Sequence, residues 1–179
     1  YANTKLTVEN FLNQIFESEP DKWKIACLRY FNPIGAHSSG LIGENPKGNP
    51  NNIFPHLMRV ASGKDKIFNI FGGDWPTKDG TGIRDYIHVM DLAEGHLASL
   101  QFLKINVSQI IYLNLGTGKG TSVLDLIKTF EEVNKCKIPF QITKRREGDV
   151  CFLVANNKCA LNTLNWSPTR NLEDMCRDG

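Results

Sequence analysis

Residues 24–31 read KIACLRYF and lead directly into the turn-prone pair Asn32–Pro33. The run is mostly apolar and rich in strand-forming residues, which is typical of a buried strand in a parallel sheet. A helix that leads into such a strand predicts an α/β fold. The segment before the strand, from about Ala2 to Ser18, has the apolar spacing of an amphipathic helix at Val8, Phe11, Leu12, Ile15 and Phe16.

Helix and strand patterns continue to alternate along the chain, with two long loops between them. The first loop, 32–52, is rich in Asn, Pro and Gly, and its length is typical of a functional loop. The second loop spans 74–82. Ser122 and Asp125 form a capping-box-like pair at the start of a helix. We expect helices at 53–62, 91–103, 121–133 and 171–179, and strands at 66–71, 85–89, 110–115 and 138–142.

The composition is that of an ordinary globular domain. Of the 179 residues, 41% are hydrophobic and 22% are charged, which excludes collagen-like, coiled-coil and wholly disordered chains. Twenty-one Lys and Arg against nineteen Asp and Glu give a net charge of +2, too balanced for a nucleic-acid binder. We therefore expect a small-molecule partner. No apolar run reaches the roughly 18 residues of a membrane span, and a cytoplasmic location is predicted.

The cysteines and histidines indicate neither a metal site nor a disulfide framework. The cysteines are odd in number and are never spaced C-x-x-C, so reduced thiols are expected. The histidines do not cluster with carboxylates in a metal-like pattern. His96 falls on the apolar stripe of the helix 91–103, where a hydrogen-bonded core histidine is expected. The residues concerned are Cys27, Cys136, Cys151, Cys159 and Cys176, and His37, His56, His88 and His96.

Tyr1 and Lys5 stand four residues apart, so a helix places them on one face, and that face is the apolar one. An ammonium beside a phenol favours the phenolate and lowers a pKa that is about 10 in water. The pair is therefore a candidate general base. The alternative is a surface lysine that extends its ammonium into water.

A glycine-rich turn, Gly116–Gly120, follows the strand 110–115 and opens a helix, as a dinucleotide-binding fingerprint would. Its third glycine comes one residue too early. The segment about 20 residues further on, Ile138–Arg146, has only basic ionisable groups where a ribose-binding acid is needed. A tight strand-to-helix turn is the better interpretation.

Charged and aromatic residues near predicted strand ends suit a nucleotide ligand. Guanidinium groups bind diphosphate oxygens through paired hydrogen bonds, although solvated surface charge is the alternative. Phe68 and Phe71 could wall a flat nucleobase or belong to the core. The charged residues in question are Arg84, Arg145, Arg146 and Asp149.

The longer motifs resemble the UDP-glucose 4-epimerases, a group within the extended short-chain dehydrogenase/reductase family. The most specific stretch is LRYFNPIGAHSSGLIGE at 28–44, followed by GNPNN at 48–52. Further similar stretches are DGTGIRDYIHVMD at 79–91, YLNLGTGKGTSVLD at 112–125 and RREGD at 145–149. The resemblance runs along almost the whole chain and implies the C-terminal portion of such an enzyme, without the N-terminal dinucleotide-binding half.

The resemblance implies an isomerase that interconverts UDP-glucose and UDP-galactose. NAD would take a hydride from C4 of the hexose and return it to the opposite face of a keto sugar. Tyr1 would be the catalytic base and Lys5 the partner that lowers its pKa, and both would contact NAD, as would Tyr30 and Pro33. The residues implied for the UDP-hexose are Asn32, Asn52, Phe68, Phe71, Arg84, Arg146, Asp149 and Leu153.

The expected fold is the C-terminal remnant of a doubly wound Rossmann-type NAD-binding domain at 1–33, followed by a smaller mixed α/β UDP-sugar-binding lobe at 34–179. Residues 110–134 are expected to pack back onto the first domain. The intact enzyme would be a homodimer, and this chain alone is expected to be inactive. Two alternatives stay open: a non-catalytic UDP-sugar-binding fragment, and another nucleotide-sugar epimerase or dehydratase of the family. Leucine at 153 is intermediate between the family's tyrosine and cysteine, and suggests that N-acetylated UDP-hexoses are accepted.

Overall fold

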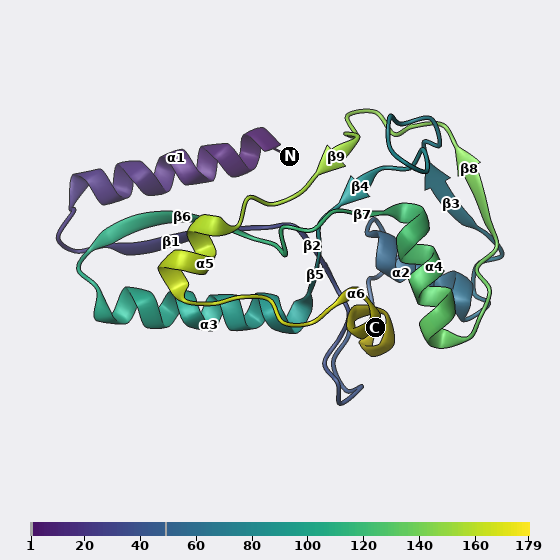
Figure 1. Cartoon of the computed structure of the whole chain (residues 1–179). Helices are drawn as coiled ribbons and strands as arrows, with labels where there is room; N and C mark the ends of the chain where they lie inside the picture. The colour runs from purple at the N-terminus through teal and green to yellow at the C-terminus, as the bar shows by residue number, and fades with distance from the viewer. Residues whose placement is uncertain (1, 49) are drawn as a thin grey trace.

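A computed structural model describes residues 2–48 and 50–179, and it confirms the α/β class. Figure 1 shows two lobes that meet around β2 and β5. The helices are α1 (Ala2–Ser18), α2 (Ile53–Ala61), α3 (Val89–Ile105), α4 (Val123–Asn134), α5 (Lys158–Leu164) and α6 (Leu172–Asp178). The strands are β1 (Lys24–Tyr30), β2 (Asn32–Ile34), β3 (Phe68–Phe71), β4 (Ile83–Arg84), β5 (Tyr86–His88), β6 (Gln109–Leu115), β7 (Thr121–Ser122), β8 (Phe140–Thr143) and β9 (Phe152–Leu153).

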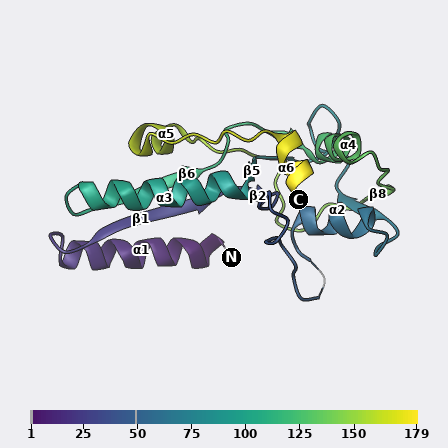
Figure 2. The ribbon, with the colours of Figure 1, turned by 90° about the horizontal axis from the view of Figure 1, so that it is seen from below.

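The first lobe is a parallel strand pair between helices. β1 and β6 pair along their full length, from Lys24 beside Gln109 to Tyr30 beside Leu115. α1 lies on one side of the pair and α3 on the other (Figure 2), and α5 packs on β6 and α3. We call the buried residues of this lobe the first-lobe core: Ile87, Leu92, Leu113, Leu115, Ala160, Leu164 and Trp166.

The predicted helix and strand of this lobe form as expected, but they are less enclosed than their apolar sequences suggest. Within the described part of β1, Cys27 is the one buried residue, and α1 has none. Val8 and Phe11 of the predicted apolar stripe are 54% and 60% exposed. The reason is that α1 is the outermost layer on its side of the strand pair (Figure 2), so only its inner face meets the described chain.

The second lobe packs α2, α4 and α6 with short strands around a core of its own. β3 pairs in parallel with β8, and β4 pairs with both β7 and β9. β5 contributes to both cores, because successive strand residues point to opposite sides: Tyr86 belongs to the second and Ile87 to the first. The second-lobe core consists of Ile34, Phe54, Leu57, Val60, Phe68, Ile70, Tyr86, Leu126, Ile127, Phe130, Ile138, Met175 and Cys176.

Residues 110–134 divide between the two lobes, which differs from the expected packing of the whole segment on the first. β6 lies beside β1, whereas α4 buries its apolar face in the second-lobe core and contacts α6. Phe130 of α4 meets Phe54 of α2 edge to face, with ring centroids 5.9 Å apart. The apolar stripe of α4 is thus covered by α2 and α6. The division of the chain at residue 33 stays a prediction.

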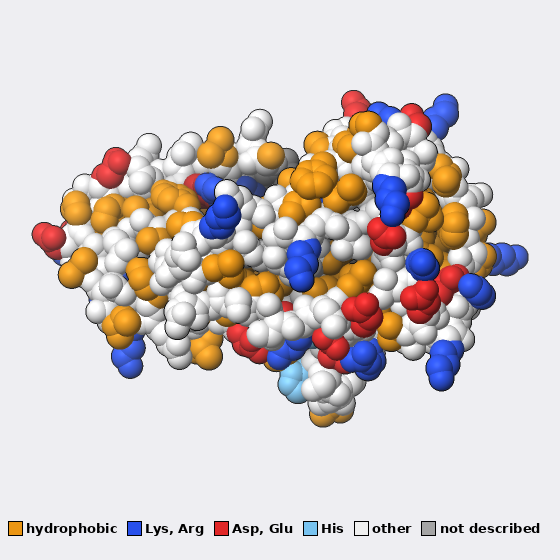
Figure 3. Space-filling model, in the orientation of Figure 1, with side chains coloured by type: hydrophobic (Ala, Val, Ile, Leu, Met, Phe, Trp, Pro, Cys, Tyr) orange, Lys and Arg blue, Asp and Glu red, His pale blue; other side chains and the backbone are white. Residues whose placement is uncertain are grey.

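The surface shows how differently the lobes are built. On the face in Figure 3, charged side chains lie among apolar ones over α4 and α6, while the half around α5 and β6 is mainly apolar or uncharged. Within the described residues, no helix is long and apolar enough to cross a membrane. The same residues contain no group of three or more His, Cys, Asp and Glu that could hold a metal ion.

Candidate functional site

A cavity of about 570 Å³ lies where the two lobes meet. It opens beyond the carboxyl end of β1 and is bordered by the start of α2, by β3 and by β4. Ligands of open α/β sheets usually bind beyond the carboxyl ends of parallel strands. The predicted site residues that line the cavity are Tyr30, Asn32, Pro33, Asn52, Phe68, Phe71, Arg84, Arg146 and Asp149.

Of the predicted site residues that the structure describes, Lys5 and Leu153 are not among those that line the cavity. Tyr1 lies outside the described residues, and Lys5 lies on α1 with its side chain exposed. Leu153 lies on β9 beside Arg84 of β4, and it is 47% exposed. The pairing of Tyr1 with Lys5 and the role of Leu153 therefore stay predictions.

Arg84 and Asp149 form an ion pair in the cavity wall. The Nη2 of Arg84 donates to Asp149 Oδ1, and its Nη1 donates to the carbonyl of Ile83 at 2.8 Å. Both charged side chains are mostly covered. The wall therefore holds a guanidinium whose charge is balanced by Asp149, and guanidinium groups bind phosphate oxygens through paired hydrogen bonds.

The two adjacent arginines of the RREGD motif have different tasks. Arg145 lies over the Trp75 ring, 3.8 Å from its centroid, and donates to Asp74 Oδ1 at 2.8 Å, which attaches this segment to the loop after β3. Arg146 stacks on the ring of Phe71, 3.8 Å from its centroid, and lines the cavity. The cavity wall therefore contains a second guanidinium, which covers one face of the Phe71 ring. Phe68, in contrast, is buried in the second-lobe core.

Tyr30 is held at its end of the cavity by His96 of α3. His96 Nδ1 lies 2.8 Å from the carbonyl of Leu92, so this nitrogen carries the proton and donates. The hydroxyl of Tyr30 then donates to His96 Nε2 at 2.5 Å. Both ring nitrogens of His96 are bonded, as the sequence predicts, but His96 is half-buried and belongs to neither core. It also orients a cavity residue.

The glycine-rich turn after β6 is held from inside the protein by Asp85. Asp85 is fully buried, and its Oδ1 accepts from the amide and hydroxyl of Thr117 at 2.8 and 2.6 Å. Its Oδ2 accepts from the amides of Gly118 and Ala155 at 2.8 and 3.1 Å. These turn amides are the groups that would face a phosphate in a dinucleotide fingerprint. A carboxylate of the protein binds them here, which favours the tight-turn interpretation.

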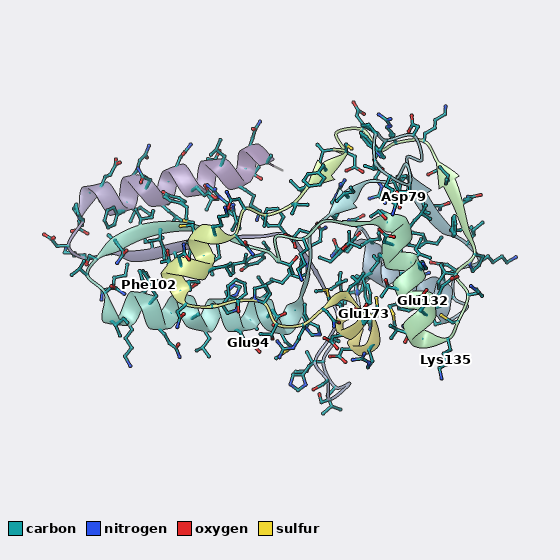
Figure 4. All side chains as sticks on the ribbon, viewed as in Figure 1. Asp79, Glu94, Phe102, Glu132, Lys135 and Glu173 are labelled. Atoms are coloured by element: carbon teal, nitrogen blue, oxygen red, sulfur yellow. The ribbon has the colours of Figure 1, made fainter. Side chains whose placement is uncertain are left out.

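Asp79 fixes the loop 74–82 to the start of α4, as its labelled position in Figure 4 shows. Its Oδ1 accepts from the amide and hydroxyl of Thr81, each at 2.8 Å, and its Oδ2 accepts from Ser122 Oγ at 2.5 Å. Partial burial raises the pKa of Asp79, but the hydrogen bonds from Ser122 and Thr81 lower it below its ordinary value. Ser122 also caps α4 by accepting from the amide of Asp125 at 3.0 Å, as its sequence pattern predicts.

Sequence reasoning missed several residues that line the cavity. Six of them lie inside the motifs quoted above, at 28–44, 48–52, 79–91 and 112–125, so the motifs themselves were the available signal: Phe31, Ile34, Asn51, Gly82, Tyr86 and Val123. The other six come from residues 53–70, which only the fold brings to the cavity. The lining residues that were not predicted are Phe31, Ile34, Asn51, Ile53, His56, Asp65, Ile67, Asn69, Ile70, Gly82, Tyr86 and Val123.

The fold and the cavity define an α/β protein with a candidate ligand site beyond the carboxyl end of a parallel strand, and comparisons with known proteins give its family. A family model described as GDP-mannose 4,6 dehydratase matches residues 1–179. UDP-glucose 4-epimerases of Dictyostelium discoideum and Bacillus subtilis (strain 168) are 48% and 47% identical to this chain over 178 residues. Each comparison covers 99% of this chain and 52% of the relative.

Solved structures of UDP-glucose 4-epimerases are also similar to this chain. A UDP-glucose 4-epimerase from Stenotrophomonas maltophila with bound NAD and formylated UDP-arabinopyranose has a TM-score of 0.95 at 49% identity. One from Bifidobacterium longum in complex with NAD+ and UDP has a TM-score of 0.94 at 43% identity. Both cover 99% of this chain and 52% of theirs. The chain belongs to the UDP-glucose 4-epimerase family of NAD-dependent epimerases and dehydratases, and it spans about half the length of the relatives it matches.

Proposed function

We propose that this chain is the UDP-sugar-binding part of an enzyme that interconverts UDP-glucose and UDP-galactose. The observation that carries the proposal is the cavity in which Arg84, Arg146 and Asp149 come together from β4 and from the loop before β9. The diphosphate would lie against the two guanidinium groups, and the uracil would lie against the Phe71 ring on the face that Arg146 does not cover.

The anchoring of the ligand accounts for the proposed reaction. Arg84 and Arg146 hold the diphosphate at a distance from C4, so the hexose can turn over in the site without leaving it. Return of the hydride to the opposite face of the sugar requires such a rotation. The diphosphate contacts, which lie away from C4, keep the ligand bound while the hexose rotates. Tyr1 is the proposed base, and Lys5 is the proposed partner that lowers its pKa.

When it is bound, NAD would supply the hydride acceptor. The two solved relatives described above contain bound NAD. Tyr30 and Pro33 fit its nicotinamide end, because they line one end of the cavity and the Tyr30 ring is held by His96. The turn 116–120 does not fit its diphosphate, because the turn amides bind Asp85. Lys5 is proposed to contact the cofactor ribose. We also propose, from the family resemblance, a homodimeric intact enzyme and acceptance of N-acetylated UDP-hexoses beside Leu153. The cytoplasmic location predicted from the sequence stays a proposal.

Calorimetric titration of UDP-glucose into the 179-residue chain tests the proposal. Saturable binding is expected, and Arg84→Ala should weaken it about ten-fold or more, because the cavity loses its covered cation. Arg177→Ala is the matched control, because Arg177 pairs with Asp174 within α6 and does not line the cavity. A chain that is folded by circular dichroism and yet shows no UDP-glucose binding would overturn the proposal.

Two parallel titrations distinguish the remaining alternatives. GDP-mannose is the natural competitor, because the matching family model describes a GDP-mannose dehydratase. Tighter binding of GDP-mannose than of UDP-glucose would favour a dehydratase of the same family. A titration with NAD shows whether the chain also takes up the cofactor. Binding of UDP-glucose without uptake of NAD would indicate that this chain acts alone as a sugar-nucleotide-binding unit.

A further inference from the structure

Tyr86 is a cavity residue for which the fold provides no hydrogen-bond partner. It lies on β5, belongs to the second-lobe core and is 3% exposed, yet it lines the cavity. Its hydroxyl is one of two buried side-chain polar atoms that lack a partner among the described residues, and the other is Trp166 Nε1. Buried polar groups nearly always have a partner, because leaving one unpaired costs stability. The Tyr86 hydroxyl therefore requires an explanation that a core position alone does not give.

The position of Tyr86 along the chain directs it to the same side as Arg84. Side chains two residues apart in an extended segment point to the same side, and the one between them points to the other. Asp85, the residue between them, binds the turn at Thr117 and Gly118. Arg84 and Tyr86 both line the cavity, in agreement with this alternation.

The hydroxyl remains a neutral donor in this environment. Burial raises the pKa of Tyr86 far above its ordinary value, and the nearby positive charge of Arg84 opposes this rise without cancelling it. The phenol therefore keeps its proton at every working pH and can donate but does not add charge. A neutral donor close to a guanidinium suits an anion with several oxygens, because one oxygen can bind the guanidinium while another accepts from the hydroxyl.

We infer, building on the proposed function, that the Tyr86 hydroxyl donates a hydrogen bond to a phosphate oxygen of the nucleotide diphosphate that Arg84 binds. Arg84 is engaged with Asp149 and with the carbonyl of Ile83. Trp166 Nε1 does not share this arrangement, because Trp166 belongs to the first-lobe core and does not line the cavity.

The experiment is calorimetric titration of UDP, and separately of uridine, into the wild-type chain and the Tyr86→Phe variant. We expect UDP to bind the variant about ten-fold more weakly, because a donor to a charged oxygen is lost. Uridine carries no phosphate and should bind both proteins equally. Tyr112→Phe is the matched control: the same hydroxyl is removed, but Tyr112 bonds Asn13 of α1 outside the cavity, so UDP affinity should not change.

Thermal unfolding without ligand is the second measurement. Tyr86→Phe should unfold at the wild-type temperature or above it, because the lost hydroxyl has no partner in the fold. Unfolding at a clearly lower temperature would mean that the hydroxyl has an internal partner, and would overturn the inference. Unchanged UDP affinity, or equal losses for UDP and uridine, would also overturn it. If the wild-type chain binds UDP-glucose but Tyr86→Phe behaves as wild type, only this inference fails. If the folded wild type binds neither UDP nor UDP-glucose, the proposed function fails with it.

Discussion

Asp85 connects the cavity wall to its surroundings through both backbone and side chain. Its carbonyl accepts from Asn32 of β2, and its carboxylate binds Thr117, Gly118 and Ala155. An asparagine would turn an amide N–H₂ toward these donors and lose the charge-assisted bonds. We expect Asp85→Asn to lower the free energy of unfolding by roughly 2–4 kcal/mol in urea titrations. The exposed Asp21→Asn should have almost no effect, and equal midpoints for both variants would contradict the role assigned to Asp85.

Asp85 also shows what the sequence could and could not predict at this scale. The motif that contains it indicated its neighbour Arg84, because an arginine near a strand end suggests an anion site. The partners of Asp85 are some 30 and 70 positions away. No local spacing indicates such contacts. Tyr86 was missed for a similar reason, since its position beside a cavity depends on how the two cores share β5.

None of the described residues of α1 is buried, so the ion pair between Glu9 of α1 and Arg29 of β1 is an important link between this helix and the first lobe. Arg29 donates to both carboxylate oxygens of Glu9, at 2.7 and 2.5 Å. Removing this pair should loosen α1 without unfolding the lobe. At pH 7, Glu9→Gln should raise hydrogen exchange in the peptide 2–18 about two- to five-fold relative to wild type. Exchange in α3, which contributes to the first-lobe core, should not change.

The same pair predicts a pH dependence. The hydrogen bond from Arg29 lowers the pKa of Glu9 below its ordinary value. A carboxylate with a lowered pKa stabilises the folded state above its unfolded pKa of about 4.3, and this contribution is lost as the pH falls through the lowered value. The difference in exchange between Glu9→Gln and wild type should therefore shrink as the pH falls below the unfolded pKa, and vanish once Glu9 is protonated in the folded state as well. Glu17→Gln is the control, because Glu17 bonds Asn13 within α1. A difference that persists at low pH would contradict the assignment.

Elements with a long periodic pattern could be predicted, and short ones could not. The bounds of α1 match the predicted helix, because five apolar positions, from Val8 to Phe16, repeat with helical spacing over about two and a half turns. α5 and β9 were not predicted, since seven and two residues are too few to show a period. Their positions are fixed by distant partners: β9 pairs with β4, and α5 packs on β6.

At the scale of the whole molecule, the two lobes are joined by a shared strand and by side-chain contacts, in addition to the covalent connections of the backbone. β5 places Tyr86 in one core and Ile87 in the other. Asp91 at the start of α3 is fully buried and accepts from Arg170, which precedes α6, with Nη1 to Oδ1 at 2.5 Å. His88 of β5 contacts Asp178 of α6 at 3.3 Å. Loss of packing in one lobe therefore removes support from the other, and we expect the chain to unfold as one cooperative unit.

Leu57→Ala tests this expectation, because Leu57 is fully buried in the second-lobe core. Such a truncation costs about 2–5 kcal/mol, through lost apolar burial and the cavity that remains. Urea unfolding is followed by circular dichroism and by the fluorescence of Trp166 in the first-lobe core, with Trp23 and Trp75 replaced by Phe. Both signals should shift together to lower urea, while Leu41→Ala, at a residue 87% exposed, should shift neither. A Trp166 signal that keeps the wild-type midpoint would mean that the lobes unfold separately, and that β5 and Asp91 position the cavity wall without coupling the stability of its two sides.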